Sequence, residues 1–576
     1  MSGTGSAGGA GTTGADPDGS VGSAVPAGSP DGTSRGAVRR GAAVMASGTA
    51  VSRLLGFLRA MALAAAIGAT GQAADAFSVA NKLPNVLFML LAGGVLNAVL
   101  VPQVVRAYKR QAGQEYVDRL LSFGFALLAV LTVALTLAAP PLVRLYADFA
   151  SETQEELAIT FAYWCIPQLF FYGAYALLGQ VLNARQSFGP YMWAPVVNNV
   201  VSIAGFGVFI AVFGRDVTAA ATWDPGRIAV LAGTATLGVV AQALVLVPFL
   251  RRAGVSYRWR WGLRGSGLGR AGTVATWTFV GLAIGLLGNL LVSRVASAAP
   301  GASDDAYVAG NAAYDYAFTL FMLPHSLVTV SLLTALFTRL STQAHDDDTA
   351  AVRGTLSSGL RVVGLFTVLA AAGLVVLAEP VTRLVLFSQP QGSVDAVAGV
   401  VAAMAVGLPA FGAWSMCQRV YYAYEDAKGM VPIQVAMVVV VAGGTLLGRA
   451  LLPSTAWVAG AGLSMSVSYV VGAVAALVLL RRRLRDVDAR AVVRTHARAL
   501  LAGLVAAGVG VLGLLALERW GPAGVAGAVV QCVVVGGAMG LVYLGALRLM
   551  RVRELDLLLG PVLRRLRKGR GSDRPV

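Results

Sequence analysis

Long apolar runs separated by short polar segments make up most of the chain from about residue 41 onward. Most of these runs exceed the roughly 20 residues that an α-helix needs to cross about 30 Å of hydrocarbon. The pattern therefore predicts an all-α polytopic membrane protein with about fourteen transmembrane helices. The spans are expected at residues 43–67, 76–105, 120–146, 157–182, 190–213, 227–250, 272–298, 306–338, 355–377, 394–424, 431–450, 456–480, 498–518 and 523–549.

A weak internal repeat divides the predicted spans into two halves. The segment LNARQSFGPYMWAP joins the fourth and fifth spans, and the similar segment YYAYEDAKGMVPIQ joins the tenth and eleventh. Leu83-Pro84 in the second span likewise returns as Leu323-Pro324 in the eighth. Repeats six spans apart predict two six-helix lobes, a common plan among transporters. The expected domains are a disordered cytoplasmic tail (1–40), an N-lobe (41–250), a C-lobe (251–480), a basic loop with the last two helices (481–550), and a basic cytoplasmic tail (551–576).

The distribution of Lys and Arg predicts the orientation of the spans. Most basic residues fall in alternate connecting segments, such as the run from Arg251 to Arg270, whereas the segment 148–156 between the third and fourth spans is acidic. By the positive-inside rule, both termini are expected in the cytoplasm. Residues 1–40 are rich in Gly, Ser and Ala, and no cleavable signal is recognised before the first span. The expected location is the cell membrane.

Composition agrees with the membrane class. The chain is 57% hydrophobic and 13% charged, with mean hydropathy +0.71, whereas a soluble domain carries about 25% charged residues. The net charge of +17 is therefore read as basic loops beside anionic headgroups rather than as a nucleic-acid surface. The three cysteines lie far apart in apolar runs, and neither a nucleophile–base pattern nor a Walker loop is present. No enzyme activity, metal site or nucleic-acid partner is expected.

Ionisable residues inside the first two spans are the strongest sign of function. Arg53, Arg59, Asp75 and Lys82 lie within otherwise apolar sequence. An Arg or Lys near the bilayer centre costs roughly 2.5–3.5 kcal/mol on insertion scales, so such side chains are expected to face a bundle interior or a wet cavity. Asp75 and Lys82 fall on nearly one helical stripe, with Asn85 one turn further, whereas Arg53 and Arg59 are about 120° apart. We expect a cationic internal cavity.

Simpler interpretations of these residues remain open. Arg53 and Arg59 could extend to the membrane interface, Asp75 could cap the start of the second span, and Lys82 could pair with Asp75. Arg294 in the seventh span, beside Ser293, is either a cavity residue or an interfacial one. An excess of enclosed cations nevertheless predicts an anionic substrate, and separated cations suit a large headgroup such as a diphosphate carrying sugars.

Five segments carry a resemblance to a known family. The sequences SRLLGFLR, ADAFSVANKLPN and GGVLNAVLVPQ, together with LNARQSFGPYMWAPVVNN and YYAYEDAKGMVPI, resemble the MurJ/MviN family of lipid II flippases, within the multidrug/oligosaccharidyl-lipid/polysaccharide exporter superfamily. The resemblance covers about residues 43–550. It implies a two-lobe, alternating-access transporter in which the positions of Arg53, Arg59 and Asp75 line a functional cavity and Lys82 matches a basic position.

The chain departs from that family pattern at several cationic positions. Phe88, Met89 and Gly93 stand where many members have two arginines and a glutamate, and Thr319 stands where an arginine of the eighth span is expected. We hypothesise that Arg294 replaces one of these cations.

The function expected from the resemblance is flipping of lipid II, the undecaprenyl-diphosphate-linked peptidoglycan precursor, from the inner to the outer leaflet. The substrate-binding residues would be Arg53, Arg59, Asp75, Lys82, Asn85 and Arg294. Three alternatives remain: an exporter of another polyprenyl-diphosphate-linked glycan, a small-molecule antiporter, and a non-transporting scaffold for wall-synthesis proteins. No cofactor is expected. Coupling to the membrane potential, Na⁺ or H⁺ is left open, as are contacts with membrane lipids and wall-synthesis proteins.

Overall fold

The structure is a computed structural model that describes residues 34–91, 114–185, 187–215, 217–261, 272–520, 524–552 and 554–555. Within these ranges every regular element is helical, which confirms the all-α prediction. The chain forms two compact units. The first comprises Met1–Ala313 with Ser388–Ser393, and the second comprises Tyr314–Phe387 with Val394–Val576.

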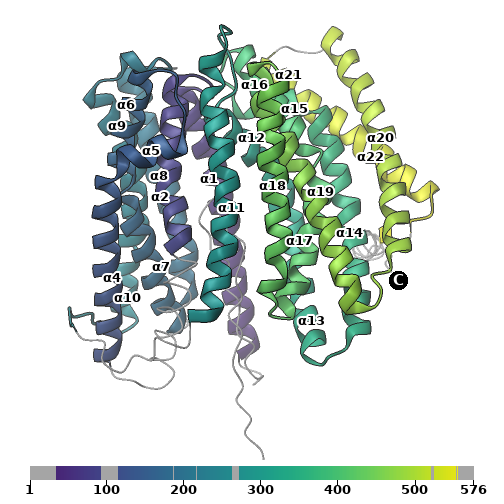
Figure 1. Ribbon diagram of the computed structural model, residues 1–576, viewed down its shortest axis with the longest axis horizontal. Helices are drawn as coiled ribbons and strands as arrows, with labels where there is room; N and C mark the ends of the chain where they lie inside the picture. Colours follow the sequence, from purple (N-terminus) through teal and green to yellow (C-terminus); the bar gives the residue numbers. More distant parts are fainter. Residues whose placement is uncertain are drawn as a thin grey trace, which may run out of the picture. The chain divides into compact units, whose positions relative to one another are not determined.

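In the first unit, long helices pack side by side (Figure 1). α1 lies along α8, α8 packs against α9, and α2 packs against α6. A leucine-rich core joins α4, α7 and α10, and includes Leu120, Leu169 and Leu246. The helices are α1 (Ser34–Ile67), α2 (Gln72–Leu91), α4 (Gln114–Leu137), α5 (Ala139–Tyr146), α6 (Glu152–Cys165), α7 (Gln168–Ala184), α8 (Phe188–Phe213), α9 (Pro225–Leu244), α10 (Leu246–Arg252) and α11 (Gly272–Ala298), with 3₁₀ turns η2 (Ala220–Thr222) and η3 (Pro300–Ala302).

The second unit is built around α14, which contacts both α17 and α20. α18 packs along α19, and α20 pairs with α22. Its elements are α12 (Asn311–Pro324, whose first residues belong to the first unit), η4 (His325–Thr329), α13 (Val330–His345), α14 (Thr349–Val376), α15 (Ala378–Val385), α16 (Gln391–Ala405), α17 (Leu408–Ala423), α18 (Ala427–Leu451), η5 (Ser454–Ala456), α19 (Trp457–Leu484), α20 (Ala489–Trp520), α21 (Gly524–Val530), η6 (Gln531–Val535) and α22 (Gly536–Leu549).

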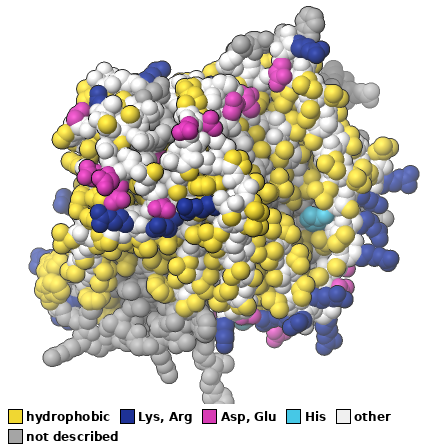
Figure 2. All heavy atoms as spheres, turned by 45° about the horizontal axis from the view of Figure 1, so that its top comes forward, with side chains coloured by type: hydrophobic (Ala, Val, Ile, Leu, Met, Phe, Trp, Pro, Cys, Tyr) yellow, Lys and Arg dark blue, Asp and Glu magenta, His cyan; other side chains and the backbone are white. Residues whose placement is uncertain are grey.

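Twelve helical stretches of the described residues are long and apolar enough to cross a membrane, and the bent pair α16–α17 raises the number to 13 if it forms one span. Each of these coincides with a predicted span. The remaining predicted span, 76–105, begins in α2 and continues into residues 92–113, which lie outside the description. Fourteen spans therefore stay a prediction. Apolar side chains cover most of the face seen in Figure 2, as expected for helices in contact with lipid.

Prolines mark several breaks in these spans, because proline cannot donate the helical hydrogen bond. Pro167 separates α6 from α7, and Pro324 ends α12 just before the π-helical turn η4. Pro409 lies at the start of α17, where the chain bends by 49° after α16. Neighbouring helices can satisfy the freed main-chain groups at such breaks.

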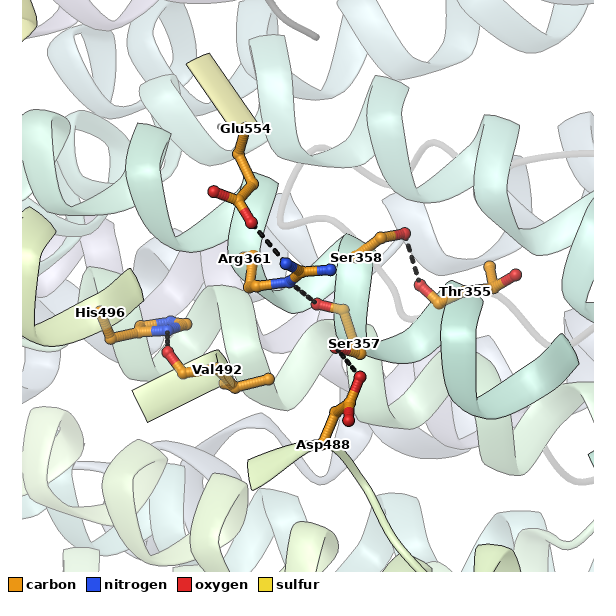
Figure 3. Close-up of polar contacts among 8 residues, drawn as sticks. All are labelled: Thr355, Ser357, Ser358, Arg361, Asp488, Val492, His496 and Glu554. Carbon is orange, nitrogen blue, oxygen red and sulfur yellow. Dashed lines mark hydrogen bonds and ion pairs between the residues drawn. The ribbon is translucent and has the colours of Figure 1, made fainter. Parts of the chain in front are cut away.

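The C-terminal helices are attached to α14 by polar contacts that the sequence did not suggest (Figure 3). Ser357 Oγ donates to Asp488 Oδ2 at 3.2 Å, and Asp488 lies in the α19–α20 connection. One turn further along α14, Arg361 pairs with Glu554, which follows α22. Glu554 is nearly buried and Arg361 is about one-quarter exposed. Two chain segments are thus fixed to neighbouring turns of one spanning helix.

The compact units divide at a different place from the predicted lobes. The expected boundary was after residue 250, but the first unit extends to Ala313 because α11 packs on α2 and α5 of that unit. At the other end, α1 already begins at Ser34, inside the predicted tail 1–40. The tail residues 1–33 and 556–576 lie outside the described residues.

Candidate functional site

A polar stripe follows one face of α2, as the sequence spacing predicts. Asp75, Ser78, Lys82 and Asn85 are separated by three, four and three residues, which places them within about 80° of one another around the helix. Asp75 is fully buried, while the other three are partly exposed. The opposite face is apolar, and its Phe77 packs edge-on against Phe161 of α6 at 5.4 Å between ring centroids. The helix therefore packs against α6 through its apolar face and carries the polar stripe on a different face.

Arg53 and Arg59 lie on α1 and are both half-buried. Leu54 and Leu58, which are 62% and 42% exposed, mark the most exposed face of this part of the helix. The two arginines flank this face on opposite sides, so the structure does not bring them together. Asn199 of α8 donates a 2.9 Å hydrogen bond to the carbonyl of Ser52, which fixes α1 against α8 beside Arg53.

The Asp75 carboxylate binds the beginning of α12. Its Oδ1 accepts a 2.8 Å hydrogen bond from the main-chain N–H of Ala312. A Cβ built on Gly310 would lie only 2.0 Å from Asp75 Oδ2, so this approach requires glycine. The first N–H groups of a helix have no helical partner and favour an anion. Asp75 therefore has a role beyond its own helix, because its carboxylate binds the start of a helix 237 residues further along the chain.

Side chains next to Ala312 make a second buried connection. Asn311 Nδ2 donates to the carbonyl of Ser293 at 2.9 Å, and Ser293 Oγ donates to Asn311 Oδ1, also at 2.9 Å. Both residues are almost fully buried. Because both hydrogen-bonding groups are satisfied away from water, the start of α12 is fixed to α11 as well as to α2.

The turn between α1 and α2 is held from one side by the α8–α9 connection. Ala73 N donates to the carbonyl of Thr218 at 2.9 Å, and Ala220 N donates to Gln72 Oε1 at 3.0 Å. Gly68 and Gly71 have φ values of +89° and +107°, which glycine adopts without strain. The chain can therefore reverse direction tightly at this point.

Residues 388–393 also hold this turn. Gln389 Nε2 donates to the carbonyl of Ala64 at 2.9 Å, and the hydroxyls of Thr70 and Ser393 are 2.7 Å apart. We call these contacts, together with those of Asp75, the turn junction: residues 64–75 with 218–220, 310–312 and 389–393. Four distant chain segments meet there.

Arg294 lies elsewhere, at the C-terminal end of α5. Its Nη1 donates to the carbonyls of Arg144 and Leu145 at 2.7 and 3.2 Å, and its Nη2 is 3.7 Å from Asp148. The side chain is 36% exposed. A cation at a helix C-terminus satisfies free carbonyls and the helix dipole. These contacts favour an anchoring role, and the hypothesis that Arg294 replaces a cavity cation stays a prediction.

Phe88 and Thr319 stand at positions where the family pattern has cations. Each makes contacts suited to its own side chain. Phe88 is buried in the leucine-rich core and lies 5.9 Å from Tyr172 between ring centroids. Thr319 donates to the carbonyl of Asp315 at 2.9 Å within its own helix. Gly93 lies outside the described residues. In the part of the chain that the structure describes, no group of three or more His, Cys, Asp or Glu side chains could hold a metal ion.

The sequence did not reveal two features. One is the set of residues that complete the turn junction, and the other is a further cation, Arg361. Thr218, Gln389 and Ser393 lie in connections with no recognisable motif, so nothing in the sequence relates them to α1 and α2. Arg361 could have been found, because it lies within the predicted span 355–377, where an arginine requires a partner.

The long apolar helices, with ionisable side chains inside several of them, define an integral membrane protein. The family model described as "Lipid II flippase MurJ" matches residues 63–534. The chain belongs to that family.

Several curated relatives match over most of their length. A protein of Rhizobium meliloti named "Probable lipid II flippase MurJ" is 28% identical over 400 residues, covering 67% of this chain and 70% of the relative. A protein of Vibrio cholerae with the same name is 26% identical over 549 residues, covering 89% and 96%. One of Burkholderia cenocepacia, named "Lipid II flippase MurJ", is 27% identical over 450 residues, covering 76% and 82%.

Solved structures show the same fold. "Lipid II flippase MurJ, inward closed conformation" has a TM-score of 0.66 at 18% identity, covering 90% of this chain and 99% of that one. An inward-facing multidrug resistance MATE family transporter of the MOP superfamily has a TM-score of 0.59 at 15% identity, covering 75% and 94%.

Proposed function

We propose that this protein flips lipid II from the inner to the outer leaflet of the cell membrane, for use in peptidoglycan synthesis. The observation that carries the proposal is the family match across residues 63–534. The polar stripe of α2 supports it, since a helix that crosses hydrocarbon keeps lysine and asparagine on one face only where that face meets polar groups or water.

The cations of α1 and α2 would attract the diphosphate of the substrate. Arg53, Arg59 and Lys82 are half-buried and therefore keep part of their surface accessible. Arginine binds phosphate oxygens with two parallel hydrogen bonds, and lysine acts as a mobile point charge. Because Arg53 and Arg59 lie on different sides of α1, they would contact different parts of a large headgroup or act at different stages of its passage. Asn85 would add a neutral hydrogen-bonding group beside Lys82.

Asp75 would control the opening of the transport path at the N-terminal end of α2. The start of α12 and residues 389–393, which both contact the α1–α2 turn, continue directly into the bodies of α12 and α16. Displacement of those helices away from the turn would break the hydrogen bonds of the turn junction. Closing the junction would restore these hydrogen bonds. Asp75 would therefore favour the conformation in which this end of the transport path is closed.

The membrane potential would assist outward movement of an anionic headgroup. An inside-negative potential contributes about 2.3 kcal/mol per elementary charge per 100 mV. With both termini in the cytoplasm, the turn junction would lie at the outer end of the spans. Coupling to Na⁺ or H⁺ and contacts with wall-synthesis proteins remain predictions from the sequence.

Reconstitution tests the proposal directly. Purified protein in proteoliposomes is supplied with fluorescent lipid II, and in a parallel sample with a polyprenyl diphosphate that carries a different glycan. We expect lipid II to cross faster than in empty vesicles and Lys82→Gln to slow this transport. Arg215→Gln, which removes an exposed arginine of the α8–α9 connection, should leave the rate unchanged. Transport of the other glycan alone would contradict lipid II as the substrate.

A further inference from the structure

The connection that follows α10 forms a strap across the start of α4. We call residues 255–261, which precede α11, the aromatic–basic strap. The Tyr257 and Ser122 hydroxyls are 2.9 Å apart, and the main-chain N–H of Arg260 donates to Ser122 Oγ at 3.0 Å. Arg260 also pairs with Glu115 at 2.9 Å. Figure 1 shows this extended segment beside the end of α4 that lies near α10. The strap is thus fixed to the helix.

The strap lies at a membrane interface. Val130, Val133 and Leu137 of α4 are 61–74% exposed and mark its lipid-facing side. Glu115 and Arg119 lie on the same side at the start of the helix, as the 100° rotation per residue requires. The 23 residues from Glu115 to Leu137 rise by about 33 Å from first to last, close to the thickness of the hydrocarbon layer. Glu115, and the strap attached to it, therefore lie where the hydrocarbon ends.

Two tryptophans of the strap are available to lipid. Trp259 and Trp261 are 52% and 65% exposed, and their ring centroids are 5.4 Å apart. Tyr257, two residues earlier, instead packs edge-on against Phe125 of α4 at 5.8 Å. Burial raises the pKa of Tyr257, and this effect outweighs the hydrogen bond with Ser122, which lowers the pKa; the nearby Asp118 carboxylate raises it further. Exposed tryptophans at this depth are typical of residues that sit among lipid headgroups.

The charge around the strap is positive. Glu115 is shared between Arg119 and Arg260, at 2.7 and 2.9 Å. Arg251 and Arg252 at the end of α10, and Arg258 in the strap, are exposed. Among the described residues of the start of α4, the end of α10 and the strap, five arginines outnumber two carboxylates, those of Glu115 and the buried Asp118. A patch of this composition attracts anionic headgroups near a charged membrane surface.

We propose that the aromatic–basic strap, with Arg251 and Arg252, is a binding site for an anionic phospholipid of the adjacent leaflet. The tryptophan rings pack beside the acyl-chain boundary, and the exposed guanidinium groups of Arg251, Arg252 and Arg258 bind the lipid phosphate. A soluble acidic partner would match the positive charge. It would not explain why two exposed tryptophans lie at the edge of the hydrocarbon. The site is separate from α1 and α2, so it does not depend on the proposed function.

Quenching of tryptophan fluorescence by brominated lipids tests the site in the full-length protein. Wild-type protein and W259F/W261F are reconstituted in phosphatidylcholine vesicles containing equal fractions of either brominated phosphatidylglycerol or brominated phosphatidylcholine. The difference between the two proteins isolates the signal of the strap. We expect phosphatidylglycerol to quench this signal at least twofold more strongly than phosphatidylcholine, and 0.5 M NaCl to reduce the excess.

Charge variants test whether the arginines of the strap cause the preference for phosphatidylglycerol. R251Q/R258Q should reduce the excess quenching at least by half, whereas R481Q/R482Q, which removes two exposed arginines at the end of α19, should leave it unchanged. Equal quenching by both lipids would overturn the proposal. It would show that the tryptophans lie at the membrane interface without a preference for anionic lipid. Absence of quenching by either lipid would also overturn it, because the strap would then lie away from the membrane.

Discussion

The Asp75 carboxylate and the main-chain N–H of Ala312 are joined by a 2.8 Å hydrogen bond between residues 237 positions apart. The bond attaches the start of α2 to the start of α12, and Gly310 provides the space for it. If the junction closes one end of the transport path, altering this contact should change both the access to that end and the transport rate.

Gly310→Ala tests the junction without removing any charge. The new Cβ would lie 2.0 Å from Asp75 Oδ2, and overpacking of this kind costs about 1–3 kcal/mol. We expect the junction to separate, so that a cysteine at Thr70 reacts faster with a membrane-impermeant maleimide. Gly285→Ala is the matched control, since nothing lies within 4 Å of its new Cβ. Equal labelling in the two variants would show that the Gly310 contact does not hold the junction closed.

Lys82→Gln tests the cationic stripe. The substitution keeps the polarity and approximate length of the side chain but removes its charge. A charge-assisted hydrogen bond contributes about 1.5–3 kcal/mol, so we expect lipid II transport in proteoliposomes to fall by about tenfold or more. Lys82→Arg should retain part of the rate. Full activity of Lys82→Gln would exclude Lys82 from the binding of the diphosphate.

Arg294→Ala separates anchoring from substrate binding. Because the guanidinium binds two carbonyls at the end of α5, its loss should lower the thermal unfolding midpoint of the purified protein by a few degrees, corresponding to about 1–2 kcal/mol. Restoration of growth by the variant in a flippase-depleted strain would then exclude the hypothesis that Arg294 replaces a missing cavity cation. Severe loss of transport with an unchanged unfolding midpoint would instead support that hypothesis.

Glu554→Gln tests the attachment of the C-terminal segment to α14. It leaves Arg361 inside a spanning helix without its carboxylate partner, and removal of one member of an enclosed pair is costly. Since Arg361 keeps about one-quarter of its surface exposed, we expect a loss of roughly 1–3 kcal/mol, measured as faster proteolysis after α22. The double variant Arg361→Gln/Glu554→Gln should recover part of the loss. Unchanged proteolysis of Glu554→Gln would show that the ion pair does not hold the segment.

The spans and the polar stripe could be predicted from local sequence because each depends on one helix. The apolar runs set the lengths of the spanning helices, and the spacing of Asp75, Lys82 and Asn85 alone places them on one face. The partner of Asp75 could not be predicted in this way. It is a main-chain N–H, which every residue except proline carries, so the sequence gives no sign of which one is bound.

The unit boundary and the role of Arg294 depend on packing between helices. Helix α11 was expected to begin the second lobe, but its contacts with α2 and α5 place it in the first unit. The sequence relates Arg294 only to its neighbours in α11, whereas its hydrogen-bond acceptors are carbonyls about 150 residues earlier. Long-range contacts between connections and helix ends carry no periodicity that the sequence could reveal.

The most direct measurement of the central claim is the amount of lipid II in the outer leaflet of cells depleted of their own flippases. Expression of this protein should restore outer-leaflet lipid II, and its Gly310→Ala and Lys82→Gln variants should restore less at equal abundance in the membrane. Outer-leaflet lipid II that stays at the depleted level with abundant wild-type protein would contradict the assignment of this chain as a lipid II flippase.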